Sequence, residues 1–304
     1  ITISDYEWHG YLTTNGYFTI DNENNYQINL LLKKDNEENS WGFSNPGCSD
    51  PLACNYDEYV TEDDGSCDYP QESWVGVSCN FVLIPEEYPT IQEGITASID
   101  GDSILVSAGI YYENISFNGK NISLIGENRE TTIIDGNQEG IVVSFTNGEG
   151  SSSKLERFTI INALSDDGYG GGGIKCFGSS PILENLIIKN NYSYRGAGIG
   201  CSNGANPILR NVLITGNTSS ESGGAIYIAN NSNPILENIT ITNNSCSRGA
   251  IYLVASNANL SNVIVWNNLS QYSIYLWASS EIEIQYSNIN NIEFAGDSGN
   301  EEWD

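Results

Sequence analysis

The sequence predicts an all-β fold, a parallel β-helix, from two observations. The phrase Pro181-Ile182-Leu183-Glu184-Asn185 returns from Pro207, from Pro234 and, more loosely, from Ala258, in steps of 26, 27 and 24 residues. A repeat this short cannot bury its own apolar face, so it must stack on its neighbours. Between residues 104 and 145, short apolar runs bounded by Gly, Asn or Asp follow one another without helices, which favours a β-helix over a β-sandwich. We therefore expect coils of about 24–28 residues.

One short helix is predicted at residues 90–99, where the coils begin. Thr90 and Glu93 have the spacing of a capping box. Ile91, Ile95 and Ile99 recur every four residues and form one apolar face. We expect this helix to cap one end of the stack.

Equivalent positions in successive coils should form columns with a spacing of about 4.8 Å. One column lies in a turn, where asparagine tolerates a left-handed backbone and stacked amides can hydrogen-bond. Its members are Asn162, Asn190, Asn243, Asn267 and Asn291, with Gly216 at the missing position. A second column is charged, and we expect its arginine to bridge the carboxylates on either side. Its members are Glu156, Glu184, Arg210 and Glu237.

A third column faces outward and ends in tyrosines. It consists of Lys175, Gly200, Tyr227, Tyr252 and Tyr275. An exposed row of the three tyrosine rings can stack on sugars or on a partner chain. Tyrosine is also favoured by β geometry alone, which is the simpler interpretation.

Two cysteines, Cys176 and Cys201, share one inward-facing coil position. Adjacent coils would allow a disulfide there, and a pair of buried free thiols fits equally well.

Composition divides the chain into three parts: a small region of β-strands at 1–46, a Cys-rich acidic module at 47–80, and a β-helix with an acidic tail at 81–304. The Cys-rich module has few aliphatic residues, so covalent links must replace a core. It has no C-x2-C pair, which favours disulfides over zinc. The cysteines concerned are Cys48, Cys54, Cys67 and Cys79.

Oxygen ligands gather in the same module. Calcium takes six to eight oxygens, and a stapled loop can supply them. A calcium site and a plain acidic loop fit this pattern equally well. The candidate ligands are Asp50, Asn55, Asp57, Asp63 and Asp64.

Charge and hydropathy exclude two classes of partner. The chain of 304 residues carries 39 acidic and 11 basic residues, a net charge of −28, which excludes nucleic acid. No run of about 18 apolar residues is present, so no membrane-spanning helix is predicted. Eight Asn-x-Ser/Thr sequons are candidate glycan acceptors in a host that glycosylates them. They begin at Asn114, Asn121, Asn191, Asn217, Asn230, Asn238, Asn243 and Asn268.

The first coils resemble those of pectinesterase-type and pectin-lyase-like right-handed β-helices. The resemblance covers residues 88 to about 292, with Thr90-Ile91-Gln92 near its start. The stretches that carry it are Gly101–Val106, Gly109–Ile115, Gly119–Gly126 and Thr132–Gly136. It implies the right-handed form of the fold, on which many unrelated functions are built.

A second resemblance concerns the Cys-rich module. Gly47–Asp57 and Glu62–Cys67 resemble a motif, GCxDPxACNYD followed by DDGSC, of secreted and surface proteins of marine bacteria. It implies an extracellular or cell-surface location in a bacterium.

The catalytic motifs of the pectin enzymes are not found. The GxxDFIFG motif of pectinesterases is missing, the arginines lie outside a pectate lyase context, and the single histidine, His9, precedes the β-helix. The best remaining carboxylate pair is Asp166-Asp167, although neighbours on a strand point to opposite faces.

We therefore expect a non-enzymatic secreted or cell-surface protein with a structural, adhesive or self-assembling role, as in a filament or surface layer. Open β-helix ends expose strand edges that template association, and the N-terminal strands offer a means of strand addition. The alternatives are a polysaccharide lyase or hydrolase, and a noncatalytic glycan-binding module that uses the tyrosine row. Partners would be further copies, other surface proteins or a polysaccharide, and the one candidate cofactor is Ca²⁺.

Overall fold

The computed structural model describes residues 10–12, 17–20, 28–34, 41–44, 46–49, 60, 62–67 and 81–295. The chain forms two compact units, Ile1–Cys79 and Asn80–Asp304. The predicted all-β fold is confirmed, because the second unit is a β-helix in which every pair of neighbouring strands is parallel.

The first unit contains an antiparallel sheet in the region where β-strands are predicted. Its strands pair in chain order: β1 (Gly10–Leu12), β2 (Tyr17–Ile20), β3 (Ile28–Lys34) and β4 (Trp41–Ser44). After them, β5 (Pro46–Gly47) pairs with β6 (Glu62–Asp63) in parallel. A disulfide joins Cys48, directly after β5, to Cys67, which follows β6. Cys54 and Cys79 lie outside the described residues.

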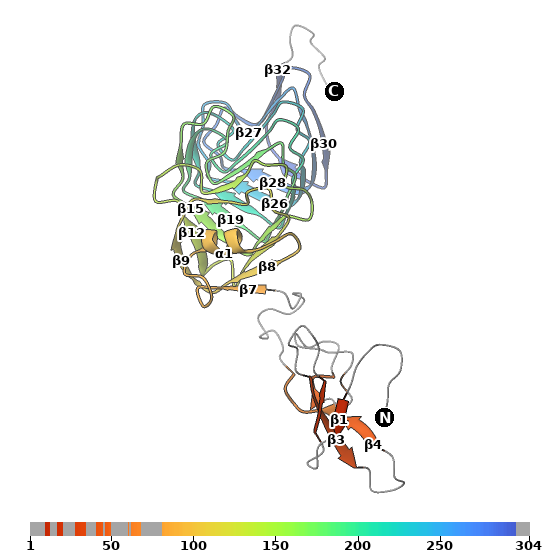
Figure 1. The fold of residues 1–304 in the computed structure, drawn as a ribbon. Coiled ribbons are helices and arrows are strands. Elements are labelled where there is room, and N and C mark those ends of the chain that lie inside the picture. Colours follow the sequence, from red (N-terminus) through yellow and green to blue (C-terminus); the bar gives the residue numbers. More distant parts are fainter. Residues whose placement is uncertain are drawn as a thin grey trace. The chain divides into compact units, whose positions relative to one another are not determined.

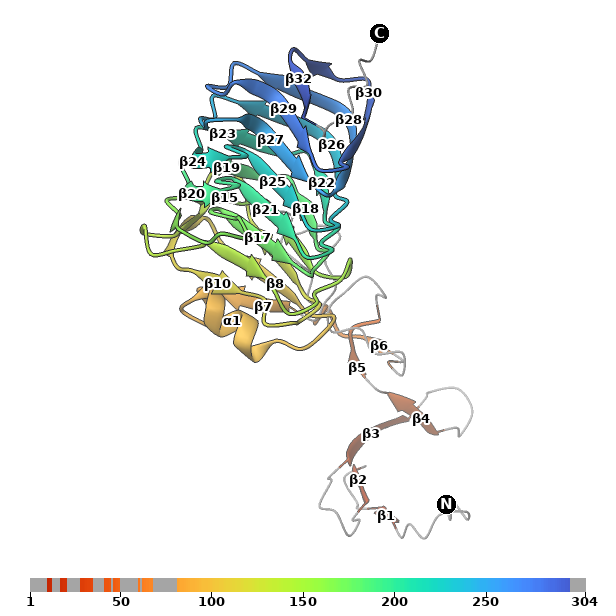
Figure 2. The same ribbon diagram turned by 90° about the horizontal axis from the view of Figure 1, so that it is seen from above.

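The coils of the second unit stack on one another, and strands from successive coils pair to form several sheets (Figure 1 and Figure 2). One sheet has eight strands: β10 (Ile115–Ser116), β13 (Val143–Phe145), β17 (Ile174–Phe177), β21 (Ile199–Ser202), β25 (Ile226–Ala229), β27 (Gly249–Val254), β29 (Tyr272–Trp277) and β32 (Ile292–Ala295). A short sheet flanks it: β16 (Leu164–Ser165), β20 (Tyr192–Arg195) and β24 (Thr218–Ser222).

The remaining strands form two stacks. The first contains β7 (Phe81–Ile84), β8 (Ser103–Val106), β11 (Ser123–Gly126), β14 (Lys154–Glu156), β18 (Ile182–Glu184) and β22 (Ile208–Arg210). The second contains β9 (Gly109–Tyr112), β12 (Thr132–Asp135), β15 (Thr159–Ile161), β19 (Ile187–Lys189) and β23 (Leu213–Thr215). The long strands β26 (Ile235–Thr242) and β28 (Asn257–Trp266) join the stacks, and β30 (Glu281–Gln285) and β31 (Asn288–Ile289) pair with β28.

The asparagine of the repeated phrase marks a bend in each coil. Asn185, Asn211, Asn238 and Asn262 all have φ between 52° and 59°, the left-handed region. The bend separates β18 from β19 and β22 from β23, whereas Asn238 and Asn262 lie within the continuous strands β26 and β28. The amides stack along the axis, with Asn262 Nδ2 donating to Asn238 Oδ1 at 2.7 Å.

The predicted turn column is confirmed at all positions but one. Asn162, Asn190, Asn243, Asn267 and Gly216 have φ between 54° and 66°. Asn291 lacks this conformation, because the chain enters β32 directly after it. Its carbonyl oxygen instead accepts from Ser273 N and Ile274 N.

A second asparagine column, one residue further along, was missed by the sequence analysis. Asn191, Asn217 and Asn244 are buried, and Asn268 continues the column. Each Nδ2 donates to the next Oδ1, at 2.9 Å for Asn191 to Asn217 and 2.9 Å for Asn217 to Asn244. A glycan on Asn191 or Asn217 would break this column, because both amides are buried and hydrogen-bonded. Glycosylation of the eight sequons stays a prediction.

The predicted capping helix is present as α1 (Ile91–Ala97). Thr90 Oγ1 accepts from Glu93 N, and Ile91 and Ile95 are fully buried. The helix is shorter than expected. It ends at Ala97, and Ile99 is 71% exposed in the turn that follows, where its N–H donates to Asp102.

Charged side chains from the next coil hold both ends of α1. Glu113 accepts from the backbone N–H groups of Ile91 and Gln92, at 2.9 Å each. Lys120 Nζ donates at 2.7 Å to the carbonyl oxygens of Ile95, Thr96 and Ser98. These contacts match the sign of the partial charge at each helix end.

We expect Lys120→Met to lower the free energy of unfolding by about 2 kcal/mol, because hydrogen bonds from a charged donor to otherwise unpaired carbonyls are lost. Chemical denaturation measures the change. Lys189→Met, on the outer face of β19, is the control and should change stability by less than about 0.5 kcal/mol. Equal effects of the two substitutions would contradict the role given to Lys120.

Candidate functional site

The outward-facing column of the eight-stranded sheet has the predicted register. Lys175 pairs with Gly200, Gly200 with Tyr227, Tyr227 with Tyr252, and Tyr252 with Tyr275. The rings of Tyr227 and Tyr252 stack with centroids 5.7 Å apart, and those of Tyr252 and Tyr275 at 5.2 Å. The expectation of an exposed row is wrong, because Tyr227 is 6% and Tyr252 3% exposed.

A glycine-rich loop, residues 166–173 between β16 and β17, and arginine side chains cover the tyrosines. Gly170 packs against Tyr227, where a Cβ on the glycine would lie 2.8 Å from ring atom Cδ1. The guanidinium of Arg195 lies over the Tyr227 ring, 5.5 Å from its centroid. The guanidinium of Arg248 lies over Tyr252 at 5.8 Å.

The same loop fills the gap that Gly200 leaves in the column. A Cβ at Gly200 would lie 2.3 Å from the carbonyl carbon of Gly170, so only glycine lets the loop cross there. Tyr169, the loop residue before Gly170, packs edge to face against Phe177 with ring centroids 5.4 Å apart. Its side chain is 56% exposed.

Asp166 and Asp167, the carboxylate pair singled out in the sequence, have different surroundings. Asp166 is exposed. Asp167 accepts from Lys175 Nζ and, at 2.8 Å, from the backbone N–H of Tyr169. The Asp167 carboxylate therefore fixes the loop.

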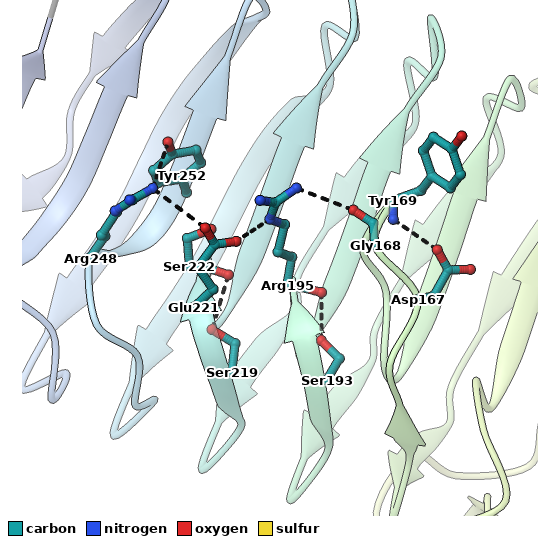
Figure 3. Close-up of polar contacts among 10 residues, drawn as sticks. All are labelled: Asp167, Gly168, Tyr169, Ser193, Arg195, Ser219, Glu221, Ser222, Arg248 and Tyr252. Atoms are coloured by element: carbon teal, nitrogen blue, oxygen red, sulfur yellow. Dashed lines mark hydrogen bonds and ion pairs between the residues drawn. The ribbon is translucent and has the colours of Figure 1, made fainter.

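A row of three charged side chains lies beside the tyrosines (Figure 3). Arg195 ends β20, Glu221 lies in β24, and Arg248 precedes β27, so each comes from a different coil. Arg195 Nε donates to Glu221 Oε2, and Arg248 Nη1 lies 3.7 Å from Glu221 Oε1. Arg248 Nη1 is also 3.4 Å from the hydroxyl of Tyr252. The side chain of Arg248 is exposed, and both of these polar contacts are long.

The arginines keep Glu221 ionised. The hydrogen bond from Arg195 lowers the pKa of Glu221, burial acts in the opposite sense, and the charges of both arginines lower it further. Because the pKa of Glu221 is lower in the folded than in the unfolded chain, its ion pair stabilises the fold fully above the unfolded-state pKa. This stabilisation is lost as the pH falls through the folded-state pKa. Glu221 is therefore a poor general acid near neutral pH.

These residues line a groove with a volume of about 430 Å³. Its lining includes Tyr169, Arg195, Glu221, Arg248, Tyr252 and Trp277. Trp277 pairs in register with Val254 on the adjacent strand and is 45% exposed. The groove thus offers exposed aromatic faces together with two guanidinium groups against one carboxylate.

The predicted charged column keeps its register but not its pairing. Glu156, Glu184, Arg210 and Glu237 stack in order. Arg210 Nε lies 2.8 Å from Glu237, while the carboxylate of Glu184 is 2.9 Å from Lys154 Nζ. The expected bridge by Arg210 to both neighbours is therefore wrong, because Lys154 on the adjacent coil reaches Glu184.

The candidate calcium ligands are only partly described. Asp63 accepts from Ser49 Oγ at 3.0 Å and from Gly65 N at 2.9 Å. The hydrogen bonds from Ser66 lower the pKa of Asp64. Asp50, Asn55 and Asp57 lie outside the described residues. Within the described ranges no three His, Cys, Asp or Glu side chains gather as metal ligands, and calcium stays a prediction.

Comparison with known proteins identifies the class of the chain. Residues 140–300 match the family described as the right handed beta helix region, and the chain belongs to this family. The predicted right-handed β-helix is thereby confirmed.

Solved structures with similar folds include pectin methylesterases. The enzyme from carrot is 14% identical, with 74% of this chain and 89% of that chain covered and a TM-score of 0.44. The enzyme from Aspergillus niger is 10% identical, with 73% and 90% covered and a TM-score of 0.34. No curated protein sequence matches the chain. None of the helices in the described part of the chain is long and apolar enough to span a membrane.

Proposed function

We propose that this protein is a non-enzymatic adhesive β-helix that binds an anionic polysaccharide in the groove between Tyr169 and Trp277. The observation that carries the proposal is the pairing of exposed aromatic faces with the guanidinium groups of Arg195 and Arg248. Aromatic rings stack on the apolar faces of sugars, and guanidinium groups bind carboxylates with two parallel hydrogen bonds.

The local charge of the groove, in contrast to that of the whole chain, supports an anionic ligand at this place. With a net charge of −28, most of the surface repels polyanions. The groove has an excess of one positive charge, and Arg248 is the cation best placed to turn toward a ligand, because its present contacts are 3.4 and 3.7 Å long. An acidic glycan would therefore be directed to this groove.

The state of the nearby carboxylates favours binding over catalysis. A glycosidase needs one protonated and one ionised carboxyl group across the scissile bond. Glu221 is bound by Arg195, and Asp167 by Lys175. The ion pair with Arg195 favours the charged form of Glu221, and the Asp167 carboxylate is occupied by its contacts within the loop.

We expect oligogalacturonate or alginate oligomers to bind, with little binding of neutral cello-oligosaccharides. Arg248→Ala and Trp277→Ala should each weaken binding about tenfold, equivalent to about 1.4 kcal/mol. Isothermal titration calorimetry at fixed ionic strength measures the affinities. Arg129→Ala is the control, because Arg129 pairs with Glu130 and does not line the groove.

Two outcomes would overturn the proposal. One is equal affinity of wild type and both groove variants for every oligomer tested. The other is turnover of a polyuronate that is lost in Asp166→Ala or Asp167→Ala, which would make the protein a carbohydrate-active enzyme.

Secretion to the cell surface is part of this proposal. The Cys48–Cys67 disulfide supports it, because disulfides persist mainly in oxidising compartments. Self-association into a filament or surface layer remains a prediction of the sequence, as does binding of Ca²⁺.

A further inference from the structure

Two cysteines lie side by side in the core of the β-helix. Cys176 in β17 and Cys201 in β21 are direct partners in the parallel register. Both are fully buried, and both thiols are free in the structure. They do not line the groove, and none of the groove contacts involves them.

The register brings the two residues within disulfide range. Neighbouring strands lie about 4.8 Å apart, and disulfide-bonded cysteines have Cα atoms about 4.4–6.8 Å apart. The side chains also point the same way, into the core, because equivalent positions of stacked parallel strands share one face. The neighbouring Cys201 thiol, together with burial, raises the pKa of Cys176 well above its usual range.

We propose that Cys176 and Cys201 form a disulfide between successive coils while the chain folds in an oxidising environment. The two thiols lose two protons and two electrons as one S–S bond forms. A small-molecule disulfide such as oxidised glutathione accepts them, its own S–S bond breaks, and two thiols are released. Exchange takes place before the coils close, because the thiolate nucleophile is scarce once both side chains are buried.

The bond would fasten the strands that support one end of the groove. On the outer face, Lys175 and Phe177 flank Cys176, and Gly200 precedes Cys201. Lys175 holds Asp167, Phe177 contacts Tyr169, and the loop crosses Gly200. Joining β17 to β21 would therefore fix the base on which the Gly-rich loop rests. This inference is independent of the ligand.

The test is refolding of the full chain followed by thiol mapping. Denatured, reduced protein is refolded with reduced and oxidised glutathione, alkylated with N-ethylmaleimide in guanidinium, and digested without reductant. We expect mass spectrometry to find the Cys176 and Cys201 peptides joined. The Cys48–Cys67 pair is an internal control that shows whether the redox conditions suffice. Protein secreted to a bacterial periplasm provides a second sample if refolding fails.

Two variants make the result decisive. Cys246→Ser removes the remaining cysteine of the β-helix and should leave the joined peptides unchanged. Cys201→Val should leave Cys176 alkylated. Reduction should lower the unfolding temperature of the wild type more than that of Cys201→Val, since both lose the Cys48–Cys67 bond. Alkylation of both Cys176 and Cys201 in wild type while Cys48–Cys67 is intact, or a bond from either to Cys246, overturns the proposal.

Discussion

Asn217→Ala is expected to lower the free energy of unfolding by about 4 kcal/mol, because several buried polar groups lose their partners and each costs about 1–3 kcal/mol. Oδ1 of Asn217 accepts from both the backbone N–H and Nδ2 of Asn191, at 3.0 and 2.9 Å. Its Nδ2 donates to Ile188 O and to Asn244 Oδ1, each at 2.9 Å. Alanine supplies none of these atoms.

The matched control is Asn211→Ala. Asn211, unlike Asn217, has a left-handed backbone, with φ of 55°. It is exposed, and its Oδ1 accepts one side-chain bond, from Asn238 at 3.2 Å. We expect a loss of about 1 kcal/mol there, mainly from the cost of a left-handed alanine. Urea denaturation of both variants measures the difference. Similar losses at the two positions would show that the buried amides contribute no more than the exposed ones.

Gly200→Ala is expected to displace the Gly-rich loop and to cost about 3 kcal/mol, the upper part of the range for overpacking a rigid site. The added Cβ would lie 2.3 Å from Gly170 C and 2.4 Å from Gly171 N. Both are backbone atoms, so no side-chain rotation can relieve the clash. The loop must lift from the sheet and carry Tyr169 away from Phe177. Affinity for an acidic glycan should then fall together with stability.

Gly168→Ala is the control in the same loop. No atom lies within 4 Å of the position that its Cβ would take, and its φ is not in the left-handed region. Thermal unfolding should be unchanged, while Gly200→Ala unfolds at a lower temperature and exchanges amide hydrogens faster at residues 165–172. Unchanged exchange in Gly200→Ala would mean that the loop does not rest on Gly200 in solution.

The fold was predictable because the repeated phrase fixes which residues of successive coils are equivalent. Once Ile182, Ile208 and Ile235 are aligned, the columns follow from the period alone, and the structure has the same register. The bend at Asn185 was not predicted, because an apolar run on both sides of an asparagine has the same pattern whether the strand is straight or bent.

The groove was harder to predict. Arg195, Glu221 and Arg248 follow different local sequences in their coils, so no repeated phrase aligns them. One signal was present in the sequence, since Gly200 interrupts a column of large side chains. A glycine at such a place indicates that another part of the chain passes over it. The burial of Tyr227 and Tyr252 depends on that crossing, which strand periodicity does not describe.

The row of Arg195, Glu221 and Arg248 has a consequence for how recognition by this protein can change. Each of the three is supplied by a separate coil, and none belongs to the core that holds the coils together. A coil gained by duplication would lengthen the groove by one step and add one side chain to the row, while the inward-facing isoleucines and leucines stayed the same. The affinity of the surface for a charged polymer can thus evolve by changes in coil number and in single outward residues, independently of stability.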